Sequence, residues 1–111
     1  MSDDLLSIRL KAIADPTRRA ILDLLAQEGA QCAGDIAGNF PDITRPGVSK
    51  HLRVLREAGL IGESDASDGR MHVYIIETEA LRIVRQWVDR YTLFWQEKLD
   101  DLERIATEDD S

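Results

Sequence analysis

The chain has 111 residues, which fits one domain small enough that a second chain could usefully add buried surface. Its hydrophobic fraction of 43% and charged fraction of 32% exclude both a disordered chain and a membrane-spanning chain. The first residues are acidic and lack the parts of a secretory signal, and the single cysteine, Cys32, excludes an internal disulfide. We therefore expect a globular cytoplasmic protein.

The net charge of -7 has the wrong sign for a nucleic-acid binder, but the charges are unevenly distributed. From Ile43 to Arg56 there is no carboxylate, and this window holds four Lys and Arg residues. The segment from Glu77 to Ser111 contains ten acidic and five basic residues, which gives a local net charge of -5. The first segment is therefore a candidate for DNA binding, whereas the second suits a solvated helix face and a tail directed away from DNA.

The first part of the chain predicts three helices. Leu6, Leu10 and Ile13 recur at helical spacing within the first, over residues 3–14. Asp15 can cap the second, and Pro16 fits its first position, where the missing N–H has no consequence. The predicted second helix ends at Gly29, and a short third helix runs from about Ala33 to Asn39.

A fourth helix is predicted from Arg45 to about Ala58. Thr44 is its natural N-cap, and Pro46 is tolerated because N–H groups in the first turn have no partner within the helix. Gly59 ends it.

Strands and one long helix are predicted after this point. Residues 60–64 and 71–76 are strand candidates, and Asp68-Gly69 between them is typical of a hairpin turn. Residues 79–106 contain no proline or glycine and repeat apolar residues at steps of three and four, which predicts a long amphipathic helix. The tail, 107–111, is expected to fray. The prediction is a single domain, 1–111, mainly α with a small β-hairpin, as about five helices plus a two-stranded wing.

The fourth predicted helix has an apolar face and a polar face. At about 100° per residue, Val48, Leu52 and Leu55 share one side and the basic residues share another. Such a charged face is by itself typical of a surface helix, but the preceding helix, the turn and the following hairpin favour a winged helix-turn-helix. Arginine can form two hydrogen bonds with guanine, serine can hydrogen-bond to different bases, and lysine is suited to binding phosphate. The predicted DNA-binding residues are Thr44, Arg45, Pro46, Ser49, Lys50, His51, Arg53, Arg56 and Arg70.

Two segments have a distinctive sequence: residues 45–61 read RPGVSKHLRVLREAGLI, and residues 14–22 read ADPTRRAIL. The first strongly resembles the recognition helix and following strand of the ArsR/SmtB-type repressors, and the second resembles their second helix. The likeness covers roughly residues 5–100. It implies a winged-helix homodimer whose first and last helices form the interface, and which represses by occupying a promoter. It also implies that the wing, beside Arg70, contacts the DNA backbone or the minor groove.

The apolar stripe of the last predicted helix is longer than one small domain can cover, which favours a homodimer. Its aromatic residues fit a core or an interface better than a ligand pocket, although the pocket remains an alternative. The predicted dimer interface consists of Leu6, Leu10, Trp87, Tyr91, Trp95 and Leu99.

Metal-sensing members of this family carry Cys-Val-Cys-Asp on the third helix, where this chain has Cys32-Ala33-Gly34-Asp35 with a single thiol. Other members bind metal between their last helices through histidines and carboxylates, but the last predicted helix here has no histidine. We therefore expect no metal and no cofactor. Cys32 is expected to be a partly buried small residue, His51 to be partly structural and partly phosphate-contacting, and His72 to be a solvated wing residue.

Two other functional classes remain open at this stage. A dimer of the same fold could bind a protein partner through its acidic surface instead of DNA. An enzyme is disfavoured, because one cysteine and two histidines on separate elements, with no glycine-rich loop, do not assemble a nucleophile, a base and an oxyanion site. The regulatory signal is either an unidentified small-molecule effector or the level of expression alone.

Overall fold

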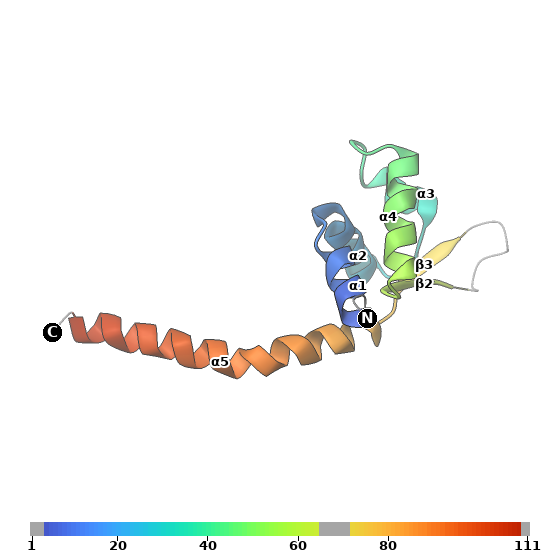
Figure 1. Cartoon of the computed structure of the whole chain (residues 1–111). Coiled ribbons are helices and arrows are strands. Elements are labelled where there is room, and N and C mark those ends of the chain that lie inside the picture. The colour runs from blue at the N-terminus through green and yellow to red at the C-terminus, as the bar shows by residue number, and fades with distance from the viewer. Residues whose placement is uncertain (1–3, 65–71, 110–111) are drawn as a thin grey trace.

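The computed structural model describes residues 4–64 and 72–109. Figure 1 shows the order of the elements along this part of the chain. The helices are α1 Leu5–Ile13, α2 Pro16–Glu28, α3 Ala33–Gly38, α4 Arg45–Glu57 and α5 Ala80–Asp109. The strands are β1 Gln31–Cys32, β2 Ile61–Ser64 and β3 Val73–Ile76. The predicted five helices are confirmed, whereas the predicted Asp68-Gly69 turn lies outside the described residues.

Side-chain caps set the helix starts where the sequence predicts them. The carboxylate of Asp15 accepts a hydrogen bond from the N–H of Arg18 at 3.0 Å, at the start of α2. The hydroxyl of Thr44 accepts one from the N–H of Gly47 at 3.1 Å, at the start of α4. At the other end of α4, Gly59 has a φ of 76°, a conformation that glycine adopts at little cost. All three predicted signals are confirmed.

The first helix begins two residues later than predicted. Asp4 lies outside α1 as its N-cap, because its carboxylate accepts a hydrogen bond from the N–H of Ser7 at 2.8 Å. The C-terminal end of α1 is held by Arg18 of α2, whose Nε donates to the carbonyl of Ala12 at 2.7 Å. These contacts fix α1 against α2.

The strands form one antiparallel sheet in the order β1-β3-β2. The prediction of two strands is therefore incomplete, because β1 pairs Gln31 with Tyr74 and Cys32 with Val73. A strand of two residues is too short to show the alternation that marks a strand in a sequence. The sheet anchors the segment before α3 to the base of the wing.

The hydrophobic core lies beneath α4 and draws on most elements of the body. The largest fully buried side chains are Ile21, Ile36, Val48, Leu55, Leu60 and Ile61. The predicted apolar face of α4 is confirmed, since its three members are 3% exposed or less. Packing of this face fixes which side of α4 remains in solvent.

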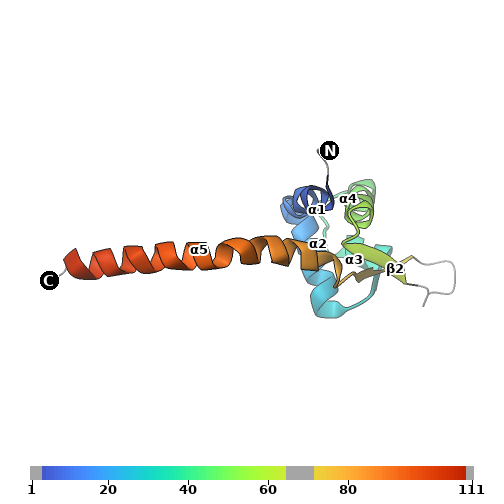
Figure 2. The same ribbon diagram turned by 60° about the horizontal axis from the view of Figure 1, so that its bottom comes forward.

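Helix α5 leaves the body and extends far beyond it, as both views of the ribbon show (Figure 1, Figure 2). Its 30 residues span roughly 45 Å at 1.5 Å per residue. It continues past the predicted end at 106 to Asp109, and the Thr107 hydroxyl donates to the carbonyl of Glu103 at 2.9 Å in this last part. None of the helices in the described part of the chain has both the length and the apolar character to cross a bilayer.

Candidate nucleic-acid interface

Helices α3 and α4 form the helix-turn-helix pair. They contact each other through the core, where Ile36 of α3 and Val48 and Leu52 of α4 are buried. The connection between them, 39–44, ends in the Thr44 cap. Because the core holds one face of α4, the opposite face is presented to solvent in a fixed orientation.

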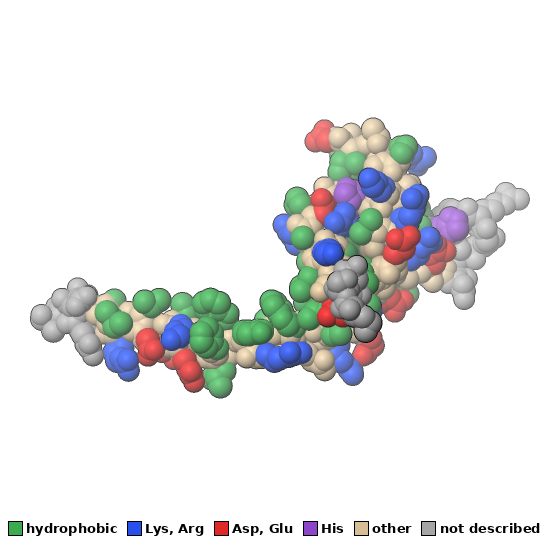
Figure 3. Space-filling model, viewed as in Figure 1, with side chains coloured by type: hydrophobic (Ala, Val, Ile, Leu, Met, Phe, Trp, Pro, Cys, Tyr) green, Lys and Arg blue, Asp and Glu red, His purple; other side chains and the backbone are tan. Residues whose placement is uncertain are grey.

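The solvent face of α4 is basic and contains no carboxylate before Glu57. Basic side chains gather over α4 in the space-filling view (Figure 3). From Arg45 to Arg56 the helix rises roughly 16 Å, enough to follow a major groove about 12 Å wide. The structure places seven predicted DNA-binding residues here in exposed positions: Thr44, Arg45, Pro46, Ser49, Lys50, Arg53 and Arg56.

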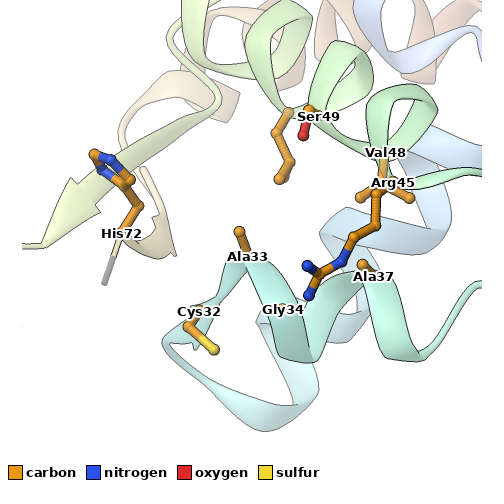
Figure 4. Close-up of a pocket in the computed structure, with 9 residues that line it drawn as sticks. Cys32, Ala33, Gly34, Ala37, Arg45, Val48, Ser49 and His72 are labelled. Atoms are coloured by element: carbon orange, nitrogen blue, oxygen red, sulfur yellow. The ribbon is translucent and has the colours of Figure 1, made fainter. Parts of the chain in front are cut away.

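Arg45 lies across a hollow of about 410 Å³ between α3, α4 and the start of β3 (Figure 4). Its guanidinium extends toward α3, where a Cβ added to Gly34 would lie 3.4 Å from Nη2. Ser49 and Cys32 line the same hollow. Because the Arg45 side chain is long and exposed, it can turn outward without disturbing the core.

His51 is held between α4 and α2, and its side chain is only 22% exposed. Its Nδ1 lies 3.3 Å from Nη1 of Arg18 and 3.9 Å from the carboxylate of Asp15. A guanidinium only donates, so this contact is a hydrogen bond only in the neutral tautomer that carries its proton on Nε2. The structural part of the prediction for His51 is confirmed, and its phosphate contact stays a prediction.

Arg56 is tied to the base of the wing. Its guanidinium donates to one carboxylate oxygen of Glu63 on β2, and Nδ1 of His72 lies 3.2 Å from the other oxygen. The hydrogen bond with His72 and, more weakly, that with Arg56 hold the pKa of Glu63 below its ordinary value of 4.5, against an opposing effect of burial. His72 is largely exposed, as predicted, but it is engaged by Glu63. Arg70 lies outside the described residues.

Sequence reasoning missed Glu63. It brings a carboxylate beside a helix that is free of carboxylates in its own sequence up to Glu57, and it compensates the charge of Arg56. No local signal identifies it, because Glu63 reaches Arg56 only after β2 has turned back beside α4.

A second surface lies on α5, where apolar side chains form an open stripe. Figure 3 shows hydrophobic side chains along one edge of α5 and most charged ones along the other. Trp87 is 36% exposed, Tyr91 45%, Trp95 60% and Leu99 57%. These four predicted interface residues border a shallow groove of about 520 Å³.

The predicted α1 residues differ from those of α5, since Leu6 and Leu10 are half-buried. On α1 the exposed apolar side chains are Leu5 and Ile8, which the sequence analysis missed. Beyond the predicted interface residues, the α5 stripe has further exposed members: Val88, Phe94, Leu102 and Ile105. Their helical spacing was the available signal.

No metal centre is formed by the part of the chain that the structure describes: no group of three or more His, Cys, Asp or Glu side chains there lies close enough to hold an ion. Cys32 is half-buried at the start of α3, which agrees with the prediction for its burial. Cys32 also lines the hollow that Arg45 crosses.

Comparison with known proteins identifies the region that contains the helix-turn-helix pair α3 and α4. A family model described as a helix-turn-helix domain matches residues 13–62. The chain is 45% identical over 78 residues to the transcriptional repressor SdpR of Bacillus subtilis, which is 70% of this chain and 82% of the repressor. It is 35% identical over 89 residues to an arsenical resistance operon repressor of Staphylococcus xylosus, covering 80% of this chain and 82% of that protein.

Solved structures agree with these relatives. A crystal structure of an ArsR family transcriptional regulator is similar with a TM-score of 0.73 and 31% identity, over 84% of this chain and 98% of that one. A homodimeric winged helix-turn-helix DNA-binding domain from Mycobacterium bovis has a TM-score of 0.62 and 29% identity, over 81% of this chain and 82% of that one. The chain is therefore a member of the ArsR family of winged helix-turn-helix transcriptional regulators.

Proposed function

We propose that this regulator is a cytoplasmic repressor that occupies operator DNA as a homodimer. The observation that carries the proposal is the solvent face of α4, which is basic, free of carboxylates and held outward by a buried opposite face. Such a face supplies both ingredients of sequence-specific binding, donors for base edges and cations for phosphates. Of the net charge of -7, a local net charge of -5 belongs to the segment from Glu77 to Ser111, which includes α5 and lies away from this face.

Base reading is assigned to the N-terminal part of α4, because that end of a recognition helix contacts base edges in this class of motif. Arg45, Ser49 and Arg53 follow one stripe of the helix and are its candidates. Lys50 and Arg70 are assigned to phosphate or minor-groove contact. Thr44 and Pro46 shape the helix start that approaches the DNA.

Two residues have divided roles. Arg56 contacts DNA only in competition with Glu63, and therefore adds less affinity than an unpaired arginine. His51 is assigned mainly to support of α4, with a phosphate contact through its Nε2 proton.

The homodimer covers the exposed stripe of α5. Two equivalent stripes, together with the exposed side chains of Leu5 and Ile8, are self-complementary, as a two-fold interface requires. A dimer also presents two α4 helices to DNA, where half-sites recur about 34 Å apart. An α5 of roughly 45 Å is long enough to join two bodies at that spacing.

The test is in vitro selection of bound duplexes from a random pool that includes the protein's own promoter, followed by competition binding at several salt concentrations. We expect Arg45→Ala to narrow the gap between the selected and random DNA by about 1 to 3 kcal/mol. Arg70→Ala should weaken binding to both about equally and make the salt slope shallower by about one unit. Arg85→Ala removes the same charge from an exposed site on α5 and serves as the control.

The competing hypothesis is a protein-interaction module that does not bind DNA, which the overall acidity favours. Such a module would neither enrich any duplex in the selection nor be retained on heparin at low salt. If Arg70→Ala lost discrimination while Arg45→Ala kept it, the roles given to α4 and the wing would be wrong.

The signal that releases the repressor is proposed to be something other than a thiol-bound metal. Arsenical resistance is named for a relative, but the third-helix segment of this chain offers one thiol, Cys32. We expect zinc, cadmium or arsenite at micromolar concentration to change DNA affinity by no more than about threefold. Release from DNA by any of them would contradict this proposal.

A further inference from the structure

Arg9 of α1 connects the end of the DNA-facing helix to the beginning of α5. Its Nε donates to the carbonyl of Ala58, at the C-cap of α4, at 2.9 Å. Its Nη1 donates to the carbonyl of Ala80, the first residue of α5, at 3.0 Å. Ala58 and Ala80 are 2% and 4% exposed, so both bonds lie at the edge of the core.

The backbone of Gly59 makes room for this guanidinium. A Cβ added to Gly59 would lie 2.9 Å from Nη2 of Arg9, closer than real Cβ contacts come. Gly59 therefore ends α4 and also lets the Arg9 side chain approach the end of that helix. Any side chain at position 59 would push the guanidinium away.

The chemistry of arginine suits this position. The guanidinium is planar and carries its donors in a rigid fork, so one group can engage two carbonyls in a defined geometry. A cation also interacts favourably with the C-terminal end of a helix dipole, which is where Arg9 meets α4. Arg9 is half-buried and lies at the opposite end of α4 from Arg45, so it is not itself a DNA contact.

We propose that Arg9 is a positioning residue that fixes the angle between α4 and α5, and thereby the spacing at which a dimer presents its two α4 helices to DNA. The inference rests on the proposed function. Helix α1 contacts both α4 and α5, so it is the element through which that angle is set. A tilt of about 10° at the end of α4 would move the far end of this roughly 20 Å helix by about 3.4 Å, one base-pair step.

The first test measures the angle without DNA. Spin labels are placed at Lys50→Cys on α4 and Glu97→Cys on α5, both exposed sites, in a Cys32→Ser background. Dilution with excess unlabelled chain leaves only the distances within one chain. We expect Arg9→Met to broaden this distance distribution by about 3 Å, because the tilt of α4 is no longer fixed. An unchanged distribution would overturn the proposal.

The second test measures spacing on DNA with unlabelled protein. The probes are the duplex selected by the wild-type chain and the same duplex with one base pair inserted between its half-sites. Arg9→Met should bind the selected duplex about tenfold more weakly and lose most of its preference over the longer duplex. The dimer dissociation constant should stay within about twofold of wild type. Loss of affinity with the spacing preference intact would mean that Arg9 only adds stability.

Three further variants separate the role of Arg9 from a general loss of stability. Gly59→Ala should reproduce the loss of spacing preference, because its Cβ displaces the Arg9 guanidinium while the arginine stays in place. Because Gly59 has a φ of 76°, this variant also strains the end of α4, and Arg9→Lys separates the two effects. Arg9→Lys keeps the charge without the fork and should give a smaller change in the same direction. Arg90→Met, an exposed site on α5, removes the same charge and should change neither measurement. If the wild-type chain selects no DNA, the proposed function fails, while the distance measurement still decides the role of Arg9 in orientation.

Discussion

Helices α4 and α5 are both amphipathic, but the chain covers the apolar face of only one of them. On α4 the apolar residues Val48, Leu52 and Leu55 are buried by the body, which leaves the basic face in solvent. On α5 the apolar face itself is in solvent, and Trp95 remains 60% exposed. The same type of pattern therefore has two uses. In the proposed function, the polar face of α4 contacts DNA and the apolar face of α5 forms the dimer interface.

The difference follows from length and position. Helix α4 has 13 residues and lies across the other elements of the body. The same chain can therefore pack against the apolar face of α4 along its whole length. Helix α5 has 30 residues and contacts the body near its beginning, through α1. The remainder of its apolar stripe can lose contact with water only against another chain.

The largest effect is expected from Trp95→Glu on α5. A central aromatic residue of an interface contributes about 2 kcal/mol, and a two-fold interface contains it twice. We therefore expect the dimer to weaken by about 4 kcal/mol, roughly a thousandfold in dissociation constant, as measured by sedimentation equilibrium. Leu93→Glu is the matched control, because Leu93 is 69% exposed and lies on the charged side of the helix, outside the stripe. Equal weakening by both variants would refute the proposed interface.

Leu55→Ala is expected to have the next largest effect, on folding. Leu55 is fully buried, and truncation leaves a cavity in the centre of the core. The free energy of unfolding should fall by about 3 kcal/mol, as measured by urea denaturation of the Trp95→Glu monomer. Leu102→Ala, at a site 63% exposed on α5, should leave the unfolding free energy of the same monomer nearly unchanged. A large loss in the second variant would mean that the body covers α5 after all.

A smaller effect is expected at the N-terminal end of α4. Thr44→Ala removes the oxygen that accepts from the N–H of Gly47, which should reduce the free energy of unfolding by about 1 kcal/mol. Thr44→Ser keeps an oxygen at the cap and should retain most of that stability. Chemical denaturation of both variants beside wild type measures the difference, and equal stability of Ala and Ser at position 44 would contradict the role of the cap.

The smallest effect is a pH dependence at the support of α4. The N–H of Arg18 and, more weakly, His51 of α4 hold the pKa of Asp15 below its ordinary value of 3.8, against an opposing effect of burial. As the pH falls below 3.8, the unfolded chain takes up this proton before the folded chain does, so folding loses stability toward the lower folded pKa. In acid denaturation curves, Asp15→Asn should therefore lose less stability than wild type over this range. A steeper loss in the variant would reverse the assigned sign.

Several parts of this fold could be read from local sequence. Asp15, Thr44 and Gly59 act through bonds or dihedrals within a few residues of themselves, which explains why their predicted positions are confirmed. The two faces of α4 follow from its period alone. The strand β1 could not be predicted, because its two residues are extended only through their pairing with β3.

The electrostatic details of the site needed the tertiary structure. Glu63 engages Arg56, Arg18 engages His51, and Arg45 lies toward α3, and each of these contacts joins separate elements. A count of charges along α4 does not distinguish its four basic residues, whereas in the fold the charge of Arg56 is compensated by Glu63. Arg9 was not singled out by its position on the first helix.

The sequence by itself determined the types of the helices, their caps and the separation of polar from apolar faces, because these depend on periodicity and on bonds between near neighbours. Only the tertiary structure decided which apolar helix face is covered, which arginine of α4 is paired with a carboxylate, and how α1 links α4 to α5. Those properties depend on contacts between residues such as Arg9, Ala58 and Ala80, which are distant in sequence and meet only when the elements pack.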